Sequence, residues 1–564
     1  MPSPSRYLLI IIGSLLLSIT MFRSGLRYPF GLGFWGPNGH DAIWHISIIN
    51  QIKNGLPPPS PVFSGNKLTN YHWGFDLFAY LTTKVIPFDI LDIYFRILPF
   101  IFAILIGLLS YHFAFLLSHC HLTSLFFVLF NFFAGSFGWI ITLIKDQQLA
   151  GESLFWSMQS ASTLINPPYA MSLIFALFGL ILWTNNHRRS PAQAILIGFV
   201  FGLITAIKIY AAIILGLSFT LYYFIQLFRH QKIFIFEFYL CLSMALTSMV
   251  IMLFLGIFSQ PSSLIFQPLW FAHTMIESPD KFFLPQLASF RYNLSLQLFS
   301  WKLPFYLILE IIILVIFIIG NLGFRIFGLF SIAHLLKARR VSPPISVLFI
   351  IMVVSLTIPV LFIQSGTSWN TIQFLYYFLF FANYFLAQSI VAIFAQHRLF
   401  AIILIILTIT GSYSTFKDYF GYPPPASLPN YEVEALNFLR QQNPGIILTQ
   451  PYDAYKKQNK LTQIPLPFYE TTAYVSAFTG KTVYLEDEMN LDITGYDWRQ
   501  RRFLSEKFFR QTPKELFENR GFLLENQIKY IYFLNLSVPE LNQKDLYLQK
   551  IFDNGYCQIY QVER

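Results

Sequence analysis

Imidazole and carboxylate side chains are concentrated between residues 23 and 94, in a stretch that separates two strongly apolar segments. The sequence there reads GHDAIWH at 39–45 and YHWGFD at 71–76. Imidazoles and carboxylates are the side chains that most often move protons in catalysis. A simple connection between two apolar segments needs no such residues, so we expect this stretch to carry a reaction site.

Asp41 is the first candidate for a catalytic group. The turn Asn38-Gly39 precedes it, and residues 41–54 have the apolar spacing of a helix that lies along a membrane interface, ended by Gly55. The carboxylate of Asp41 would act as a general base that takes a proton from an acceptor hydroxyl or amine. The alternative is a capping aspartate that binds the first backbone N–H groups of this helix.

The same stretch holds four side chains that would support Asp41: His40, His45, His72 and Asp76. They would orient the carboxylate or cap neighbouring helices. A divalent metal held by Asp41 and His45, which share one helix face four residues apart, is the weaker alternative. The spacing of these residues matches no strong metal-binding motif.

Lys208 is the second candidate, because it interrupts an apolar block, residues 192–228, that is too long for one membrane span. A hairpin of two short helices would place Lys208 at its tip. There its ammonium group would bind a lipid phosphate, or it would simply extend to ordinary headgroups. Arg96 and Arg291 are further candidates for phosphate binding, since a guanidinium fork binds two phosphate oxygens; the alternative for both is an interface anchor.

Polar and aromatic side chains gather in further turns between the apolar blocks. Amide groups and aromatic faces are what the hydroxyls and the apolar side of a sugar ring bind. The candidates for contacts with a sugar or an acceptor are Asn166, Tyr210, Trp369, Asn370 and Gln373. Four residues near the end of the chain could also contact an acceptor, with ordinary domain surface as the simpler interpretation: Asp453, Tyr455, Glu470 and Tyr474.

The elements that must position these residues are mostly membrane helices. Of the 564 residues, 55% are hydrophobic and 12% are charged, whereas a soluble protein carries about twice that charged fraction. The apolar blocks predict about eleven transmembrane helices. They lie at 7–22, 95–117, 125–144, 170–183, twice within 192–228, and at 233–258, 303–323, 345–363, 374–394 and 399–413. The first resembles a signal peptide without a cleavage pattern, so we expect it to be retained.

Basic residues predict the orientation of these spans. One side of the predicted bundle collects Arg6, Arg188, Arg189, Arg229, Lys232, the cluster at 337–340 and Arg398. The positive-inside rule makes this side, and the N-terminus, cytoplasmic. The loop 23–94 and the chain after Ser414 then face outward, and a bacterial inner membrane is the expected location.

Composition also divides the chain. We predict a transmembrane domain at 1–413 that includes the outer loop 23–94, a linker at 414–429 and a soluble, extracytoplasmic α/β domain at 430–564. The last would contain helices at 430–442 and 499–517 and strands at 445–449, 482–485, 529–534 and 556–562.

Several function classes lack support in the sequence. There is no P-loop, no GxGxxG motif, no nucleophile elbow and no zinc motif, which leaves ATP-driven transport and serine hydrolysis without support. The net charge of +10 fits membrane topology and anionic lipid rather than nucleic acid, because no basic run follows a phosphate backbone. Three cysteines build no disulfide framework.

Taken together, this layout resembles the GT-C superfamily of polytopic glycosyltransferases. The resemblance rests on the short first span, the long outer first loop with an early aspartate, the later outer loops and the soluble tail. The chain is also similar to a bacterial branch of uncharacterised membrane proteins, through GHD at 39–41, YH at 71–72, INPP at 165–168, KIY at 208–210 and WN at 369–370. In the tail, QPYDAY at 450–455 and SAFTGKTVYL at 476–485 belong to the same resemblance.

The resemblance implies a hexosyltransferase that moves a sugar, with inversion, from a polyprenyl-phosphate-linked donor to a glycan, lipid or protein acceptor. Asp41 holds the position of the superfamily's loop aspartate. One departure is that better-known branches carry an acidic pair where this chain has Asp41-Ala42. Two rivals remain, namely a transporter or flippase for a lipid-linked saccharide and a catalytically inactive, glycan-binding member of the fold.

Overall fold

The computed structural model describes residues 4–185, 189–231, 233–259, 264–297, 301–339, 341–456, 463–510, 516–534 and 541–563. Three basic residues on which the predicted orientation relies, Arg188, Lys232 and Arg340, lie outside these ranges. The chain divides into two compact units. Unit 1 comprises Met1–Thr20, Phe100–Met252 and Ser263–Phe420, and unit 2 comprises Met21–Pro99, Leu253–Ser262 and Gly421–Arg564.

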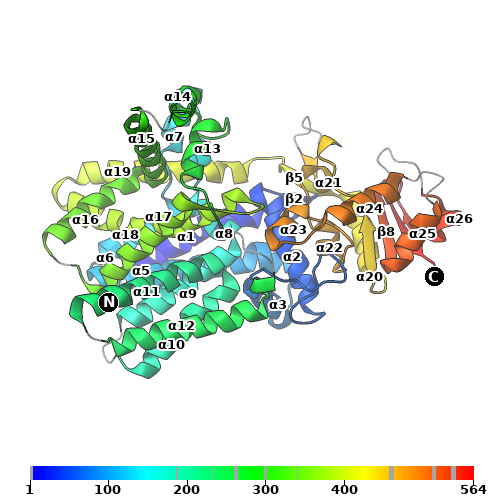
Figure 1. Cartoon of the computed structure of the whole chain (residues 1–564), viewed down its shortest axis with the longest axis horizontal. Coiled ribbons are helices and arrows are strands. Elements are labelled where there is room, and N and C mark those ends of the chain that lie inside the picture. The colour runs from blue at the N-terminus through cyan, green and yellow to red at the C-terminus, as the bar shows by residue number, and fades with distance from the viewer. Residues whose placement is uncertain are drawn as a thin grey trace. The chain divides into compact units, whose positions relative to one another are not determined.

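Unit 1 is built from apolar helices (Figure 1). Its helices, wholly or mainly, are α1 (Pro4–Phe22), α5 (Leu98–Ser118), α6 (His121–Phe133), α7 (Gly138–Asp146), α8 (Gln159–Ile165), α9 (Pro167–Thr184), α10 (Pro191–Ile207), α11 (Ile209–His230), α12 (Ile235–Phe254), α13 (Trp270–Glu277), α14 (Pro285–Ser295), α15 (Leu303–Leu322), α16 (Gly328–Lys337), α17 (Pro343–Leu361), α18 (Gln373–Gln396) and α19 (Arg398–Phe420). Shorter elements are η3 (Glu152–Phe155), η5 (Gly323–Phe327), η6 (Ser368–Ile372) and the strand pair β3 (Leu264–Phe266) and β4 (Phe362–Gln364).

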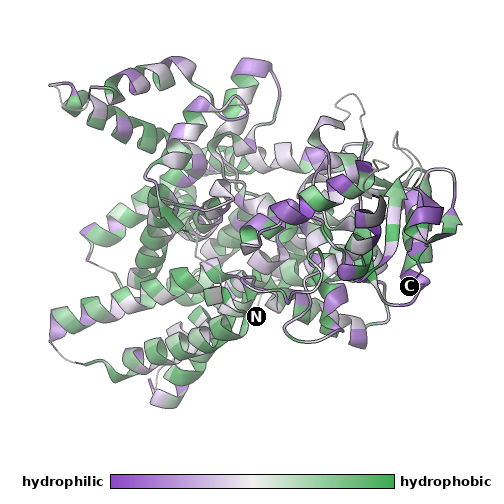
Figure 2. Cartoon of the chain, turned by 45° about the vertical axis from the view of Figure 1, so that its right-hand side comes forward, coloured by the Kyte–Doolittle hydropathy of each residue, from purple (hydrophilic) through white to green (hydrophobic). Residues whose placement is uncertain are grey.

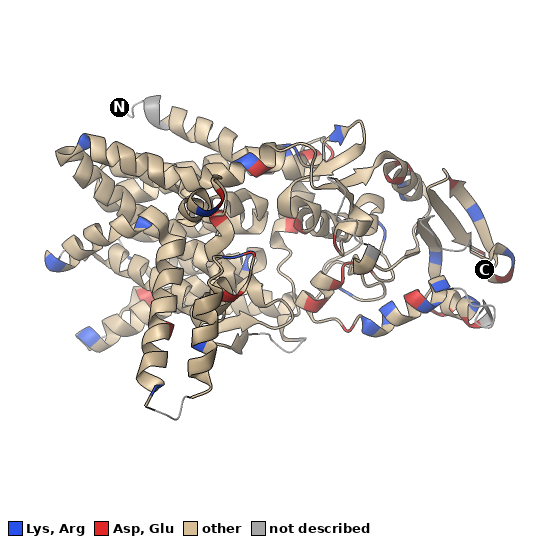
Figure 3. Ribbon diagram, turned by 90° about the horizontal axis from the view of Figure 1, so that it is seen from above, with Lys and Arg blue, Asp and Glu red and all other residues tan. Residues whose placement is uncertain are grey.

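These helices confirm the predicted polytopic architecture. In the described part of the chain, eight helices are long and apolar enough to cross a membrane. The bent pair α6 and α7 and two shorter apolar helices, Tyr7–Phe22 and Pro191–Ile207, lie at the remaining predicted spans. Hydrophobic residues dominate these helices (Figure 2), and charged residues are sparse in them (Figure 3). The chain is therefore an integral membrane protein in fold and composition, while its orientation stays a prediction.

The predicted hairpin at Lys208 is present as α10 and α11. Lys208 separates the two helices with an extended backbone, at φ −157° and ψ 103°. The ring centroids of Phe201 and Phe219 lie 5.0 Å apart, whereas one straight helix would hold them about 27 Å apart. The chain therefore reverses at Lys208, and the two short helices pack on each other.

The break between α6 and α7 shows how unit 1 satisfies backbone groups inside an apolar environment. The two helices meet at an angle of 51°, and the residues between them cannot complete a helical ladder. The buried side chain of Arg325 donates to the carbonyl oxygens of Ala134 and Gly135 at 2.6 and 3.0 Å. These bonds replace the helical hydrogen bonds that are lost at the break. Inside a lipid bilayer no water is present to bond the free carbonyl groups.

Unit 2 combines the first loop with the end of the chain. Its elements before unit 1 resumes are β1 (Arg27–Tyr28), β2 (Gly31–Phe34), η1 (Gly36–Gly39), α2 (Asp41–Ile52), α3 (Gly74–Val85), α4 (Ile90–Asp92) and the π-helical η2 (Ile93–Ile97); η4 (Ile257–Ser259) lies in its short middle segment. The C-terminal elements are β5 (Ala426–Pro429), α20 (Asn430–Gln441), β6 (Ile446–Thr449), η7 (Ala454–Lys456), β7 (Ile464–Pro465), α21 (Leu466–Tyr469), α22 (Tyr474–Thr479), α23 (Glu488–Thr494), α24 (Arg499–Arg510), α25 (Leu516–Glu525), β8 (Ile528–Leu534), α26 (Gln543–Leu546), β9 (Leu548–Asp553) and β10 (Cys557–Val562).

Two four-stranded sheets organise unit 2. One has the order β1-β2-β5-β7 and the other the order β6-β8-β10-β9. In the first sheet, β2 of the loop pairs antiparallel with β5, with Leu32 opposite Leu428. Asn50 of α2 also donates to the carbonyl of Ala477 in α22, at 2.7 Å. The first loop thus shares a sheet and a helix contact with the C-terminal segment, while the predicted domain boundaries at 413 and 429 stay a prediction.

The secondary structure of the tail follows the sequence with two differences. The predicted helix 430–442 and the strands at 445–449, 529–534 and 556–562 appear as α20, β6, β8 and β10. Residues 482–485 form only a single bridge, Ile447 opposite Val483, instead of a strand. The predicted helix 499–517 is α24 up to Arg510, and residues 511–515 lie outside the described ranges.

Candidate active site

Asp41 is the first residue of α2, directly after the turn η1. His40 occupies the N-cap position with no side-chain capping bond, so the structure does not give Asp41 the role of the capping residue. The Asp41 side chain is 53% exposed. A carboxylate in this position is accessible to a substrate while its backbone is held by the helix.

His40 lies between two carboxylates. Its Nδ1 is 2.9 Å from Oδ1 of Asp41, and its Nε2 is 3.4 Å from Oδ1 of Asp487. Burial lowers the pKa of His40, but the charges and hydrogen bonds of Asp487 and Asp41 outweigh it, so the pKa stands well above its ordinary value. These contacts favour the protonated ring, which donates from Nδ1 to Asp41 and holds that carboxylate in place. Nε2 lies at ion-pair distance from Asp487 but makes no hydrogen bond of good geometry among the described residues.

Asp487 is a buried residue that local sequence patterns did not single out. Its side chain has no exposed area and caps α23, accepting from the backbone N–H of Asn490 at 3.2 Å and from the Asn490 amide at 2.8 Å. Its φ of 50° lies in the left-handed region, which Asp tolerates better than most residues. The available signal was the acidic run 486–488 that follows the apolar segment 482–485.

Two of the other predicted first-loop residues form a separate buried pair. Nδ1 of His45 is 2.7 Å from Oδ1 of Asp76, and the Asp76 side chain has no exposed area. Burial raises the pKa of Asp76, although His45 lowers it. The rings of Phe75 and Tyr71 lie 5.6 and 6.2 Å from the His45 ring. This pair joins α2 to α3 within an aromatic cluster.

His72 belongs to the same aromatic cluster. Its ring stacks on that of Tyr71 with centroids 4.8 Å apart. No three His, Cys, Asp or Glu side chains converge as metal ligands within the described ranges. The weaker alternative, a metal on Asp41 and His45, has little to support it, because Nδ1 of His45 is already bonded to Asp76 and Asp41 is bonded to His40. No step proposed below passes through a metal.

Four of the sugar and phosphate candidates of unit 1 come together in one hydrogen-bonded chain. Lys208 donates to Oδ1 of Asn166 at 3.4 Å, and the amide of Asn166 donates to Oε1 of Gln373 at 3.1 Å. Gln373 in turn donates to Oδ1 of Asn370 at 2.6 Å. Segments far apart in the sequence therefore supply one polar cluster at the ends of α9, α10 and α18.

Tyr210 completes this cluster. The ammonium of Lys208 lies 5.1 Å from its ring centroid, and its hydroxyl donates to Gln364 at 3.1 Å. Lys208 itself is 5% exposed, so the apolar span carries a nearly buried cation, held by an amide and an aromatic face. Trp369, next to Asn370, is 46% exposed.

The two arginines predicted to bind phosphate are engaged in local contacts. Arg96 donates to Oδ1 of Asp92 at 2.9 Å and to the carbonyl of Ser24 at 2.6 Å. These contacts fix the start of the first loop to η2. They favour the alternative interpretation of Arg96 as an anchor.

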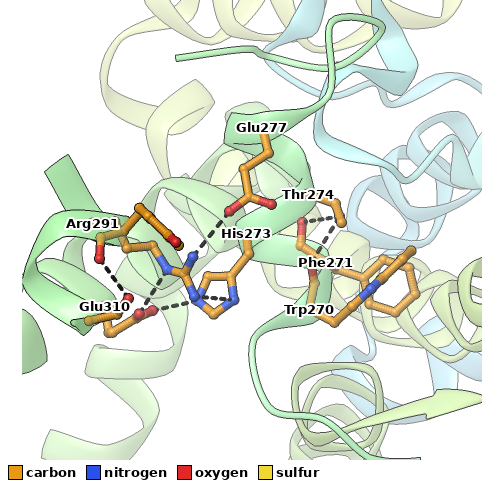
Figure 4. Close-up of polar contacts among 9 residues, drawn as sticks. Trp270, Phe271, His273, Thr274, Glu277, Arg291 and Glu310 are labelled. Atoms are coloured by element: carbon orange, nitrogen blue, oxygen red, sulfur yellow. Dashed lines mark hydrogen bonds and ion pairs between the residues drawn. The ribbon is translucent and has the colours of Figure 1, made fainter. Parts of the chain in front are cut away.

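Arg291 of α14 is surrounded by polar side chains from α13 and α15 (Figure 4). Its guanidinium reaches Oε1 of Glu310 at 2.9 Å, Oε1 of Glu277 at 3.1 Å and Nδ1 of His273 at 3.0 Å. Two carboxylates already neutralise this cation, so a phosphate would have to displace one of them.

Comparison with solved structures finds a protein of similar fold. The fold is similar to the crystal structure of an Archaeoglobus fulgidus oligosaccharyltransferase solved as a complex with zinc and sulfate, with a TM-score of 0.45 and 14% sequence identity over 93% of this chain and 67% of that chain. The chain matches no protein-family profile, and no curated protein is similar to it.

Proposed function

We propose that this chain is a membrane glycosyltransferase that transfers a sugar from a polyprenyl-phosphate-linked donor to an acceptor, with Asp41 as the general base. The observation that carries the proposal is the position of His40 between two carboxylates. His40 orients the half-exposed carboxylate of Asp41, and the buried carboxylate of Asp487 lies on the other side of its ring. Such a fixed, accessible carboxylate is suited to take a proton from a nucleophile.

The proposed reaction is a single displacement. Asp41 takes the proton of the acceptor hydroxyl or amine while the acceptor atom attacks the anomeric carbon of the donor. The bond between that carbon and the phosphate oxygen breaks, and the lipid phosphate leaves with the electron pair. Because the phosphate is a stable anion it needs no proton, and a cation suffices to stabilise it. A single displacement inverts the anomeric configuration.

Lys208 is the proposed partner of the donor phosphate. Its ammonium lies in a polar cluster with Asn166 and Tyr210, on a backbone that is interrupted at this point. A cation kept in an apolar span is costly unless it serves a function or is solvated. Amide groups of Asn166, Asn370 and Gln373 would contact the donor sugar or the phosphate.

The test is sugar transfer by the purified full-length protein in lipid nanodiscs, with polyprenyl-phosphate hexoses as donors. The Asp41→Asn variant should lose transfer by about 10²–10⁴-fold, the usual contribution of a general base. The matched control is Asp497→Asn, which changes an exposed aspartate of the same unit and should leave transfer unchanged. A flippase, or an inactive glycan-binding protein, would transfer no sugar, whether or not Asp41 is present.

A further inference from the structure

The C-terminal segment of unit 2 contains a cavity of about 540 Å³. Its wall is formed by the segment after β6, by the region of α21 and α22 and by α24. Asp487 belongs to this wall, and the same carboxylate holds His40. The cavity is large enough for a side chain or a sugar ring, within the range of small-molecule sites.

Carboxylates outnumber cations on the cavity wall. The acidic residues that line it are Asp453, Glu470, Glu486, Asp487, Glu488 and Glu506, against the two arginines Arg502 and Arg510. Arg502 already forms ion pairs with two of these carboxylates, because its guanidinium lies 2.6 Å from Oε2 of Glu488 and 2.8 Å from Oε1 of Glu506. Like charges around one cavity repel each other unless a cation compensates them. A phosphate or another anion is correspondingly excluded.

Burial modifies this charge without removing it. Glu486 accepts backbone N–H bonds from Val475 and Ser476 at 2.8 and 3.2 Å, yet burial raises its pKa well above the ordinary value. Glu486 therefore contributes less negative charge than its type suggests. Two wall carboxylates, Asp453 and Glu470, form no ion pair with Arg502 and are partly exposed.

Aromatic rings line the same cavity. They are Tyr452, Tyr455, Phe468, Tyr474 and Phe509. Aromatic faces attract organic cations through the ring quadrupole, and the attraction adds to that of carboxylates. No group of three or more metal-ligating side chains is found within the described ranges, so the combination favours an organic cation over a metal ion.

A second, independent feature of the wall also points to a ligand. Thr472 lines the cavity and is 4% exposed. Its hydroxyl has no hydrogen-bond partner among the described residues. Buried hydroxyls are nearly always bonded. The Thr472 oxygen itself is covered, so an N–H donor of a ligand would supply the missing partner only after a small shift of the wall.

We propose that this cavity binds a primary ammonium group, carried either by a lysine side chain of a peptide or by an amino sugar. The identification of this ligand as the sugar acceptor rests on the proposed function, whereas binding of the ammonium group does not. With that identification, the acceptor is recognised in the C-terminal segment, against the carboxylate that holds His40.

The experiment measures binding to the full-length protein in nanodiscs by calorimetry, without any donor. The probes are trilysine and glucosamine, each compared with its N-acetylated form, which carries an acetyl group in place of the ammonium charge. Binding by trilysine alone identifies a peptide ligand and binding by glucosamine alone an amino sugar, and either result supports the proposal. Equal binding of the acetylated form, or no binding by either amine, overturns it.

Variants assign the binding to this cavity. Asp453→Asn with Glu470→Gln should weaken binding of the amine at least tenfold, and Thr472→Val should weaken it less, because charged partners contribute more than neutral ones. The control Glu525→Gln changes an exposed carboxylate that does not line the cavity and should bind as the wild type does. Equal affinity of the control and the double variant contradicts the proposal.

The failures of the two proposals are distinguishable. Amine binding without any sugar transfer would contradict the transferase assignment and leave the cation site standing. Transfer that depends on Asp41, without amine binding, would remove the cation site and leave the transferase standing.

Discussion

Nε2 of His40 lies 3.4 Å from Oδ1 of Asp487, while Nδ1 of the same ring lies 2.9 Å from Oδ1 of Asp41. The residue after Asp41 is Ala42, so the sequence places no acidic residue beside this carboxylate. The fold supplies a second carboxylate through the imidazole instead. It comes from the far end of the chain, at the start of α23.

Replacement of Asp487 by Asn should impair transfer without unfolding the protein. Asn is as good an N-cap as Asp, so α23 keeps the capping bond from the backbone N–H of Asn490. The bond that Oδ2 accepts from the Asn490 amide and the buried negative charge beside His40 are lost. We expect transfer to fall by about tenfold, typical for a partner that orients a functional group, and the alkaline limb of the pH profile to move to lower pH. An unchanged profile would mean that Asp487 serves only the helix.

His40 should make stability depend on pH in a defined direction. Its folded pKa is raised above the unfolded value of 6.5, so its contribution is complete below about pH 6.5 and is lost as the pH rises through the folded pKa. The difference in melting temperature between the wild type and His40→Gln should therefore be largest near pH 6 and shrink in alkaline buffer. A difference that grows with pH would contradict the imidazolium assignment.

The buried His45–Asp76 pair should matter for folding. Removal of one partner leaves the other buried without compensation, which costs about 3–5 kcal/mol for a charged pair. Asp76→Ala should therefore lower the melting temperature strongly, and Asp76→Asn, which keeps a hydrogen-bond acceptor for His45, should lower it less. Comparable, small effects of both variants would show that the pair contributes little.

Lys208 should act on the donor. In Lys208→Met we expect the KM for the polyprenyl-phosphate sugar to rise by about tenfold or more, since a charge-assisted bond to a bound phosphate contributes about 1.5–3 kcal/mol; Lys208→Arg should recover part of the loss. Lys417→Met removes an exposed lysine at the end of α19 and serves as the control. A purely structural Lys208 would change stability and leave the KM unaltered.

Arg291 is expected to behave as a structural residue. Its guanidinium joins Glu310 of α15 and Glu277 of α13. Arg291→Ala removes the cation from both carboxylates and leaves Glu310 with its bond to His273, so it should destabilise unit 1. A donor-binding role predicts the opposite pattern, with normal melting and a raised KM for the donor. Melting and donor kinetics on the same preparation separate the two roles.

Features that depend on short segments of sequence were predicted from local patterns. The apolar blocks and the lysine inside one of them predicted the spans and the reversal at Lys208, because span length and the cost of a buried charge are properties of short segments. The polar side chains at 166, 208 and 370 also contact one another through hydrogen bonds, because they lie at the ends of helices of one bundle.

Long-range pairings were beyond such patterns. Nothing periodic links His40 to Asp487 or Leu32 to Leu428, because these contacts depend on how distant segments meet. The same holds for the buried His45–Asp76 pair: the sequence placed both residues near Asp41, and only the fold shows that they bond to each other. Residues 482–485 have strand composition yet form one bridge, between Val483 and Ile447 of β6.

The most direct test of the account is the rate of sugar transfer by Asp41→Asn and Asp41→Glu, measured under single-turnover conditions with saturating donor. We expect Asp41→Asn to bind donor normally and to lose transfer by about 10²–10⁴-fold, and Asp41→Glu to retain a measurable part of it. Transfer by Asp41→Asn at the wild-type rate would show that this carboxylate is not the base and would contradict the proposed mechanism.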